Sequence, residues 1–138
     1  MFREMRKKER ELAAEEAVQI LEKQIYGVLS TIGEDGFPYG VPVNYVTDKE
    51  KIYFHCAKDA GQKLENIRYC PKVCFTVVGE TEVLSSKFST RYESVVVYGE
   101  CKEAENKEEV LKMLIEKYSS DYKESGFKYV REAMDKTG

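Results

Sequence analysis

Residues 26–45 read YGVLSTIGEDGFPYGVPVNY and predict two neighbouring strands joined by a tight turn. The first part is rich in apolar and β-branched side chains, and the turn segment 33–36 ends in Asp-Gly, a frequent hairpin dipeptide. Residues 38–46 continue as the second strand. Because Pro42 has no N–H group to donate to a neighbouring strand, we expect a sheet edge or a bulge at that point. The stretch therefore predicts an antiparallel hairpin.

The rest of the chain places helices before and after further strands, as is typical of an α+β protein. Residues 13–24 carry apolar side chains at helical spacing and predict an amphipathic helix. Five strands joined mostly by tight turns favour an antiparallel sheet closed into a small barrel over an open parallel sheet. The further strands are expected at 51–56, 73–83 and 91–104, and the further helices at 61–69, 110–118 and 125–135.

Length and charge narrow the class of protein. We expect the 138 residues to form one domain over residues 1–138, because a chain of this size suits a single core. The net charge of −3 and the scattered basic residues do not favour nucleic-acid binding. No apolar stretch approaches the roughly 18 residues of a membrane-spanning helix, and the charged start lacks the apolar core of a signal peptide. We expect a cytoplasmic protein with no nucleic-acid or membrane partner.

The four cysteines are interpreted as free thiols, since disulfides are rare in a reducing compartment. Cys70 and Cys74 are separated by three residues, whereas structural zinc sites more often use pairs separated by two. We therefore expect ordinary buried thiols and no metal.

Residues 52–67, IYFHCAKDAGQKLENI, carry the main functional signal. Asp59 and Gln62 have the spacing of a capping box, which would start a helix near residue 60 and place Lys63 in its first turn. A lysine at the positive end of a helix dipole is unfavourable unless an anion lies nearby. The segment is therefore either a phosphate cradle or a helix start with a solvated lysine.

Two other side chains remain open on pattern alone. His55, the one histidine of the chain, is either a structural residue at a strand end or an acid–base group. Arg91 begins a strand and either pairs with a phosphate or partner carboxylate, or forms a surface ion pair of little energetic value. No glycine-rich dinucleotide fingerprint follows any expected strand.

Taken in order and spacing, four segments resemble the pyridoxamine-phosphate-oxidase-like FMN-binding split barrels, and among these the nitroimidazole-resistance (Nim) group. The segments are residues 26–31, 36–45, 52–67 and 90–99, and the resemblance runs from about Leu12 to Thr137. It implies an α+β fold, an antiparallel split β-barrel with flanking helices. It also implies a homodimer that holds FMN in two equivalent clefts at the subunit interface.

The resemblance also implies which residues bind the cofactor. His55 would lie near the reactive edge of the flavin as the catalytic proton donor. The implied set is Pro42, Val43, Asn44 and Tyr45 along the isoalloxazine ring, His55, Cys56 and Ala57 past the ribityl chain and ring edge, Lys63 and Asn66 at the phosphate, and Arg91, Tyr92 and Ser94 from the neighbouring strand or the other subunit.

The activity implied by the resemblance is that of an FMN-dependent oxidoreductase, similar to a nitroreductase. Electrons would pass from NAD(P)H or another donor to a small-molecule acceptor such as a nitroaromatic or a quinone. The alternatives are a non-catalytic flavin- or haem-binding module and a pyridoxamine-phosphate oxidase, although no second basic cluster suits a second phosphate. Family members usually carry another strand after the sequence Asp-Lys-Thr, whereas this chain stops at Gly138. Without it, we expect an exposed edge and a weaker dimer or flavin site.

Overall fold

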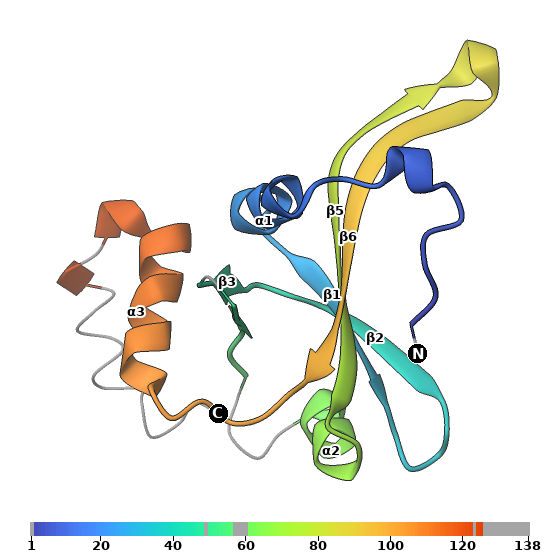
Figure 1. Ribbon diagram of the computed structural model, residues 1–138. Coiled ribbons are helices and arrows are strands. Elements are labelled where there is room, and N and C mark those ends of the chain that lie inside the picture. Colours follow the sequence, from blue (N-terminus) through green and yellow to red (C-terminus); the bar gives the residue numbers. More distant parts are fainter. Residues whose placement is uncertain (1, 49, 57–60, 123, 126–138) are drawn as a thin grey trace.

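The computed structural model describes residues 2–48, 50–56, 61–122 and 124–125 (Figure 1). Within these ranges, one α-helix precedes four consecutive strands, a second α-helix separates them from two long strands, and a third α-helix follows. In order, the elements are η1 Lys8–Arg10, α1 Ala14–Lys23, β1 Gly27–Ile32, β2 Pro38–Val43, β3 Val46–Thr47, β4 Ile52–Tyr53, α2 Gln62–Tyr69, β5 Lys72–Leu84, η2 Ser85–Lys87, β6 Ser89–Glu100, α3 Lys107–Tyr118 and η3 Ser120–Tyr122.

The strands form a four-stranded sheet in the order β2-β1-β5-β6 and a two-stranded sheet of β3 and β4. Every strand pair is antiparallel. Figure 1 shows α1 and α2 near the four-stranded sheet, with α3 beyond β3. The structure thus confirms the α+β class, with antiparallel strands and flanking helices. Pro42 lies on β2, an edge strand, as its missing N–H group predicted.

The prediction of one strand over residues 38–46 is wrong. β2 ends at Val43, and the chain crosses to the second sheet before β3 begins at Val46. At this crossing the Asn44 side chain donates to the carbonyl of Ile25, and Tyr45 turns its ring into the core. These two contacts hold residues 44 and 45 away from β1, so the backbone no longer pairs with that strand there. The next strand is also shorter than predicted, because only residues 52 and 53 pair with β3.

The core lies on one face of the four-stranded sheet. Leu29, Phe75 and Val77 project from the central strands, and Ile20 of α1 covers them. Tyr45 meets Phe75 edge to face, with ring centroids 5.0 Å apart. A smaller cluster attaches α3 to β3; its buried members are Val46, Val110 and Leu114.

The helices match the sequence pattern except where capping was predicted. α1 and α2 fall within one residue of the ranges 13–24 and 61–69. The N-cap of α2 is Gly61, at φ 90°, and no side chain caps it. The capping box of Asp59 and Gln62 therefore does not mark the start of the helix as predicted. Asp59 itself lies outside the described residues. Nearly all of the helix predicted over 125–135 lies outside them as well.

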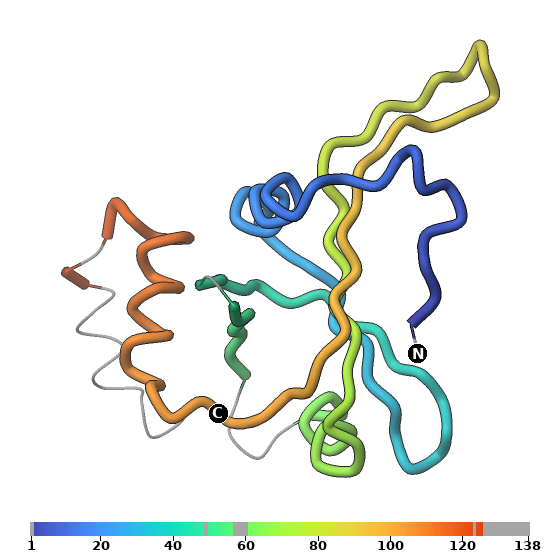
Figure 2. The backbone as a smooth tube through the Cα atoms, in the orientation of Figure 1, coloured from blue at the N-terminus to red at the C-terminus, as the bar shows by residue number. Residues whose placement is uncertain are grey.

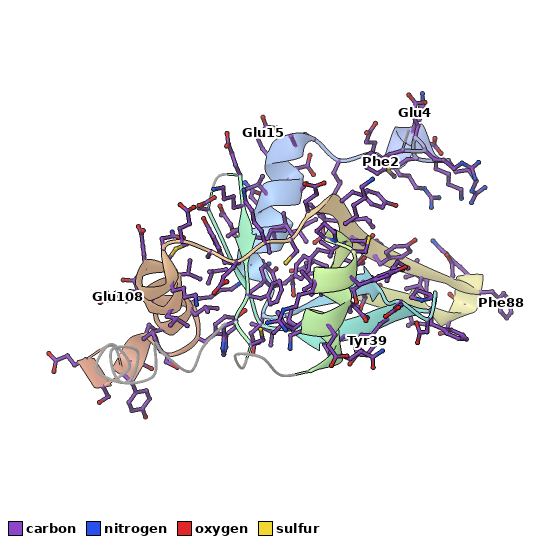
Figure 3. The ribbon with its side chains drawn as sticks, turned by 90° about the horizontal axis from the view of Figure 1, so that it is seen from below. Phe2, Glu4, Glu15, Tyr39, Phe88 and Glu108 are labelled. Carbon is purple, nitrogen blue, oxygen red and sulfur yellow. The ribbon has the colours of Figure 1, made fainter. Side chains whose placement is uncertain are left out.

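β5 is longer than predicted, whereas β6 begins and ends earlier than predicted, at Ser89 and Glu100. The two strands leave the sheet together. β1 pairs with β5 only through Thr76, whereas β5 and β6 continue past an irregularity between Val78 and Thr81 to the η2 turn. We call residues 79–93 the hairpin arm (Figures 1 and 2). At its tip Phe88 has a left-handed backbone, φ 51°, and a side chain that is 98% exposed (Figure 3).

Candidate functional site

The four-stranded sheet has a second face, opposite the core, that carries no charge at its centre. We call it the outer face and define it by ten residues whose neighbours along each strand point into the core. Two rows cross all four strands, and a third pair extends them on β5 and β6. The rows are Pro42–Val28–Thr76–Val96 and Gly40–Ser30–Cys74–Tyr98, and the pair is Val78–Ser94.

The outer face is only partly covered within one chain. Val78, Val96 and Tyr98 each expose about half of their surface. The N-terminal segment covers one corner, where Phe2 stacks on Tyr98 with ring centroids 4.4 Å apart. A sheet face of this composition that stays exposed is typical of a surface that binds another molecule.

The residues predicted along the flavin ring divide between the two faces. Pro42 lies on the outer face, as does Ser94, which was predicted to come from a neighbouring strand. Val43 packs against the core instead. Tyr45 is fully buried, and its hydroxyl donates to the carbonyl of Leu21. Its burial raises the pKa of the Tyr45 phenol to about 12.

At the start of α2, Lys63 and Asn66 face different surroundings. Lys63 is half-buried on the same helix face as Ile67, which packs against the core. Asn66 is buried and donates its amide to the hydroxyl of Thr31 over 3.0 Å. It therefore joins α2 to β1, while the Lys63 amine forms no ion pair with any part of the chain that the structure describes.

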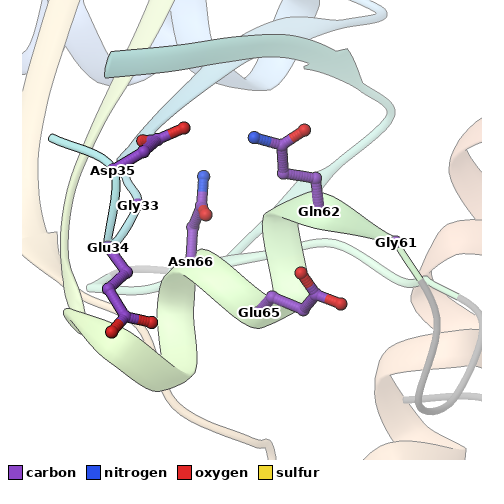
Figure 4. Close-up of a pocket in the computed structure, with 7 residues that line it drawn as sticks. All are labelled: Gly33, Glu34, Asp35, Gly61, Gln62, Glu65 and Asn66. Atoms are coloured by element: carbon purple, nitrogen blue, oxygen red, sulfur yellow. The ribbon is translucent and has the colours of Figure 1, made fainter. Parts of the chain in front are cut away.

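A hollow of about 330 Å³ lies between the β1–β2 turn and the first turn of α2 (Figure 4). Its lining residues are Gly33, Glu34, Asp35, Gly61, Gln62, Glu65 and Asn66. Three of these side chains are carboxylates, which would repel a phosphate. A phosphate held by Lys63 would therefore lie on the other side of α2.

His55 and Cys56 were predicted at the end of a strand over residues 51–56, but β4 ends at Tyr53 and both residues lie beyond it, after Phe54. The His55 side chain is exposed and Cys56 is half-buried, while Ala57 lies outside the described residues. None of the four cysteines forms a disulfide, and all four side chains are half-buried, less than the full burial that was expected. Burial, and to a smaller extent the nearby Cys56, raise the pKa of the Cys101 thiol. Among the residues that the structure describes, no cluster of histidine, cysteine and carboxylate side chains could hold a metal ion.

Arg91 and Tyr92 lie on the hairpin arm, next to Ser94 on β6 but away from Lys63 and Asn66 on α2. Arg91 forms an ion pair with Glu82, its direct cross-strand neighbour, and both side chains are exposed. Ten residues of β5 separate Glu82 from the end next to α2, a span of roughly 30 Å at 3.3 Å per residue. One chain therefore does not bring Arg91 close to Lys63 (Figure 1).

Sequence reasoning missed the two residues at the end of α3. Lys117 and Tyr118 contact the backbone of Tyr45, 72 and 73 residues earlier in the chain. Tyr118 was expected only as the last residue of the helix over 110–118, and no local pattern marked Lys117. In the described parts of the chain, no helix is both long and apolar enough to cross a membrane.

Comparison with known proteins now adds to this geometry. No curated protein matches the sequence at a significant level. Among solved structures, a conserved hypothetical protein from Mycobacterium tuberculosis aligns with a TM-score of 0.75 and 22% identity, covering 92% of this chain and 77% of the other. A candidate 5-nitroimidazole antibiotic resistance protein from Bacteroides thetaiotaomicron aligns with a TM-score of 0.68 and 23% identity, covering 79% and 68%.

An FAD and haem binding protein from Mycobacterium smegmatis has the same fold at 16% identity, with a TM-score of 0.70 over 83% of this chain and 58% of its own. These likenesses establish the fold as the antiparallel split barrel that the sequence predicted. Residues 13–137, nearly the whole chain, match the family described as pyridoxamine 5′-phosphate oxidase. The chain therefore belongs to the pyridoxamine 5′-phosphate oxidase family.

Proposed function

We propose that this protein binds FMN between two copies of the chain and uses it to reduce small molecules. The observation that carries the proposal is the uncharged outer face, which remains half exposed in a single chain. A flat isoalloxazine ring and a second subunit both require an apolar surface of this kind. Pro42 and Ser94, two of the residues that the family resemblance assigns to the flavin, lie on it.

The phosphate end of the cofactor fits the first turn of α2. Lys63 brings a positive charge that no described carboxylate neutralises. The N-cap residue of the helix is Gly61, which offers no side chain to its first N–H groups. A doubly charged phosphate compensates the Lys63 charge and accepts hydrogen bonds from the first N–H groups of α2. The three carboxylates of the hollow in Figure 4 define the side of α2 that the phosphate avoids.

The hairpin arm supports a second copy as part of the site. Arg91 and Tyr92 lie roughly 30 Å along β5 from α2, so they and Lys63 can serve one flavin only if two chains contribute. The arm also exposes apolar side chains that a monomer has no use for, including Val83 and Phe88. A homodimer places such side chains against a partner.

When bound, FMN supplies the electron-transfer chemistry. The residues of the chain position the reaction and handle protons. Lys63 balances the phosphate charge, and the outer face excludes water from one side of the ring. His55, exposed after β4, donates a proton from its imidazole to the acceptor as the acceptor is reduced. We take the donor to be NAD(P)H or a similar hydride source and the acceptor to be a nitroaromatic or a quinone.

The names of the structural relatives support this reading in part. One relative is described as a 5-nitroimidazole resistance candidate and another as an FAD and haem binding protein. The second description favours one alternative, a module that binds haem or flavin without turnover, for which the exposed His55 would be a haem ligand. The four cysteines, none of which forms a disulfide, support a cytoplasmic location.

The test is a visible absorption spectrum of the purified protein after addition of FMN and removal of unbound cofactor. Flavin bands that stay with the protein support the proposal, and a Soret band after addition of haem supports the alternative. Oxidation of NADH in the presence of a nitro acceptor then separates a reductase from a carrier. A rate no higher than that of free FMN would rule out the reductase.

A further inference from the structure

The end of α3 binds together two distant segments where the chain leaves the four-stranded sheet. The N–H group of Tyr45 donates to the hydroxyl oxygen of Tyr118 over 3.0 Å. The Tyr118 hydroxyl lies 2.7 Å from the carbonyl of Ile25 and 2.8 Å from that of Tyr45, so its own proton satisfies one of them. Asn44 also donates to the Ile25 carbonyl, over 2.8 Å. These contacts fix the backbone that directly follows Pro42 and Val43.

Lys117 adds a positive charge to the same point. Its Nζ donates to the carbonyl of Tyr45 over 3.0 Å and lies 3.9 Å from the centre of the Tyr45 ring. The Tyr118 ring centroid is 5.3 Å away. Burial lowers the pKa of the Lys117 amine and raises that of the Tyr45 phenol. At neutral pH the phenol is therefore uncharged. We take the amine, whose ordinary pKa is 10.5, to be the cation.

This cation has no described carboxylate as a partner. Partial burial of an unpaired charge opposes folding, and Tyr118 already attaches α3 to the Tyr45 backbone without any charge. A methionine or leucine would fill the same space with a smaller desolvation cost. The charge therefore calls for a reason beyond the attachment of the helix.

Building on the proposed FMN site, we propose that Lys117 is a positioning residue that fixes segment 42–45, whose Pro42 lies on the outer face, and holds a positive charge behind that segment. Transfer of a hydride to oxidised flavin brings two electrons and one proton and leaves the neutral ring with one negative charge. A fixed cation near the ring stabilises this reduced form more than the oxidised form. Lys117 thereby raises the tendency of the bound cofactor to accept a hydride.

The experiment compares the reduction potential of FMN bound to the wild-type protein and to Lys117 variants. Lys117→Gln keeps a donor for the Tyr45 carbonyl but removes the charge, and Lys117→Met removes both. Lys117→Arg retains the charge. Tyr118→Phe loosens the backbone without changing charge, and Tyr122→Phe, at an exposed tyrosine on η3, is the matched control.

We expect Lys117→Gln and Lys117→Met to lower the preference of the protein for reduced over oxidised FMN about tenfold. This corresponds to a fall of about 30 mV in the two-electron reduction potential. Lys117→Arg should restore the wild-type potential. Tyr118→Phe should weaken binding of oxidised and reduced FMN equally and leave the reduction potential unchanged. Tyr122→Phe should change neither the FMN affinity nor the reduction potential. If Lys117→Met does not fold, Lys117→Gln carries the comparison.

Two results would overturn the inference while leaving the proposed function intact. One is a wild-type potential in Lys117→Gln, and the other is a potential in Lys117→Arg as low as that of the neutral variants. A wild-type protein that retains no FMN after removal of unbound cofactor would remove the proposed function, and this inference with it.

Discussion

The side-chain amide of Asn66 donates to the hydroxyl of Thr31 over 3.0 Å, and both residues are buried. This single bond joins the helix that carries Lys63 to the central strand β1. Loss of the Thr31 hydroxyl would leave the Asn66 amide buried without this hydrogen bond, which costs about 1–3 kcal/mol. The Thr31 hydroxyl itself also donates to the carbonyl of Tyr39, over 3.5 Å. The position of the proposed phosphate site therefore depends on a contact in the core.

We expect Asn66→Ala to lower the free energy of unfolding by about 1–3 kcal/mol, measured by urea denaturation. Thr31→Val should also destabilise the protein. The double variant should cost less than the sum of the two single variants, because it leaves no unpaired polar group. Strict additivity would mean that the two side chains do not depend on each other.

Gly27 is required by the packing of Phe75. A Cβ atom at Gly27 would lie 2.3 Å from the Phe75 ring, so Gly27→Ala must displace a ring at the centre of the core. We expect a loss of about 1–3 kcal/mol in the free energy of unfolding. Gly99→Ala is the matched control, because no atom lies within 4 Å of the added group. Equal stability of the two variants would contradict this account of the core.

Local sequence patterns predicted the elements whose stability is local. The hairpin turn at residues 33–36, the amphipathic α1 and the edge strand with Pro42 all follow from side chains close together in the chain. The break between β2 and β3 does not. It depends on Asn44 bonding to Ile25 and on Tyr45 bonding to Tyr118, contacts across 19 and 73 residues that no short pattern records.

The candidate site shows the same division. Alternation along each strand puts Pro42 and Ser94 on one predictable face, and the positive end of a helix marks Lys63. The sequence could not show that the Asn66 amide is hydrogen-bonded to Thr31. An asparagine that binds a phosphate and one that forms a buried hydrogen bond within the fold look alike in a helix sequence. Nor could it reveal the length of the hairpin arm, because β5 and β6 support each other beyond the edge of the sheet.

Phe88 at the tip of the hairpin arm combines an unfavourable backbone with a fully exposed ring. A left-handed conformation costs a non-glycine residue about 1–2 kcal/mol, so Phe88→Gly should not destabilise the monomer. If the ring packs against a second copy, the same variant should weaken dimerisation about tenfold, measured by sedimentation equilibrium. Lys87→Gly serves as a control at the neighbouring position. An unchanged dimer constant would show that the tip lies outside the interface.

Tyr45 predicts how stability changes in alkali. The folded protein keeps the phenol proton up to about pH 12, whereas the unfolded chain releases it near its ordinary pKa of 10.0. The contribution of the neutral phenol is therefore complete below pH 10 and is lost as the pH rises toward 12. We expect wild-type stability to fall by roughly 1–2 kcal/mol between pH 9 and 11.5 relative to Tyr45→Phe. Parallel pH profiles of the two proteins would contradict the buried phenol as the cause.

Lys63 decides whether the start of α2 holds a phosphate. A charge-assisted hydrogen bond to a phosphate contributes about 1.5–3 kcal/mol, so Lys63→Ala should weaken FMN binding roughly tenfold to a hundredfold. Riboflavin lacks the phosphate and should bind both proteins equally, which separates a lost phosphate contact from a damaged ring site. Lys102→Ala removes an exposed lysine after β6 and should leave both affinities unchanged. Equal loss of riboflavin and FMN binding in Lys63→Ala would move the phosphate away from this helix.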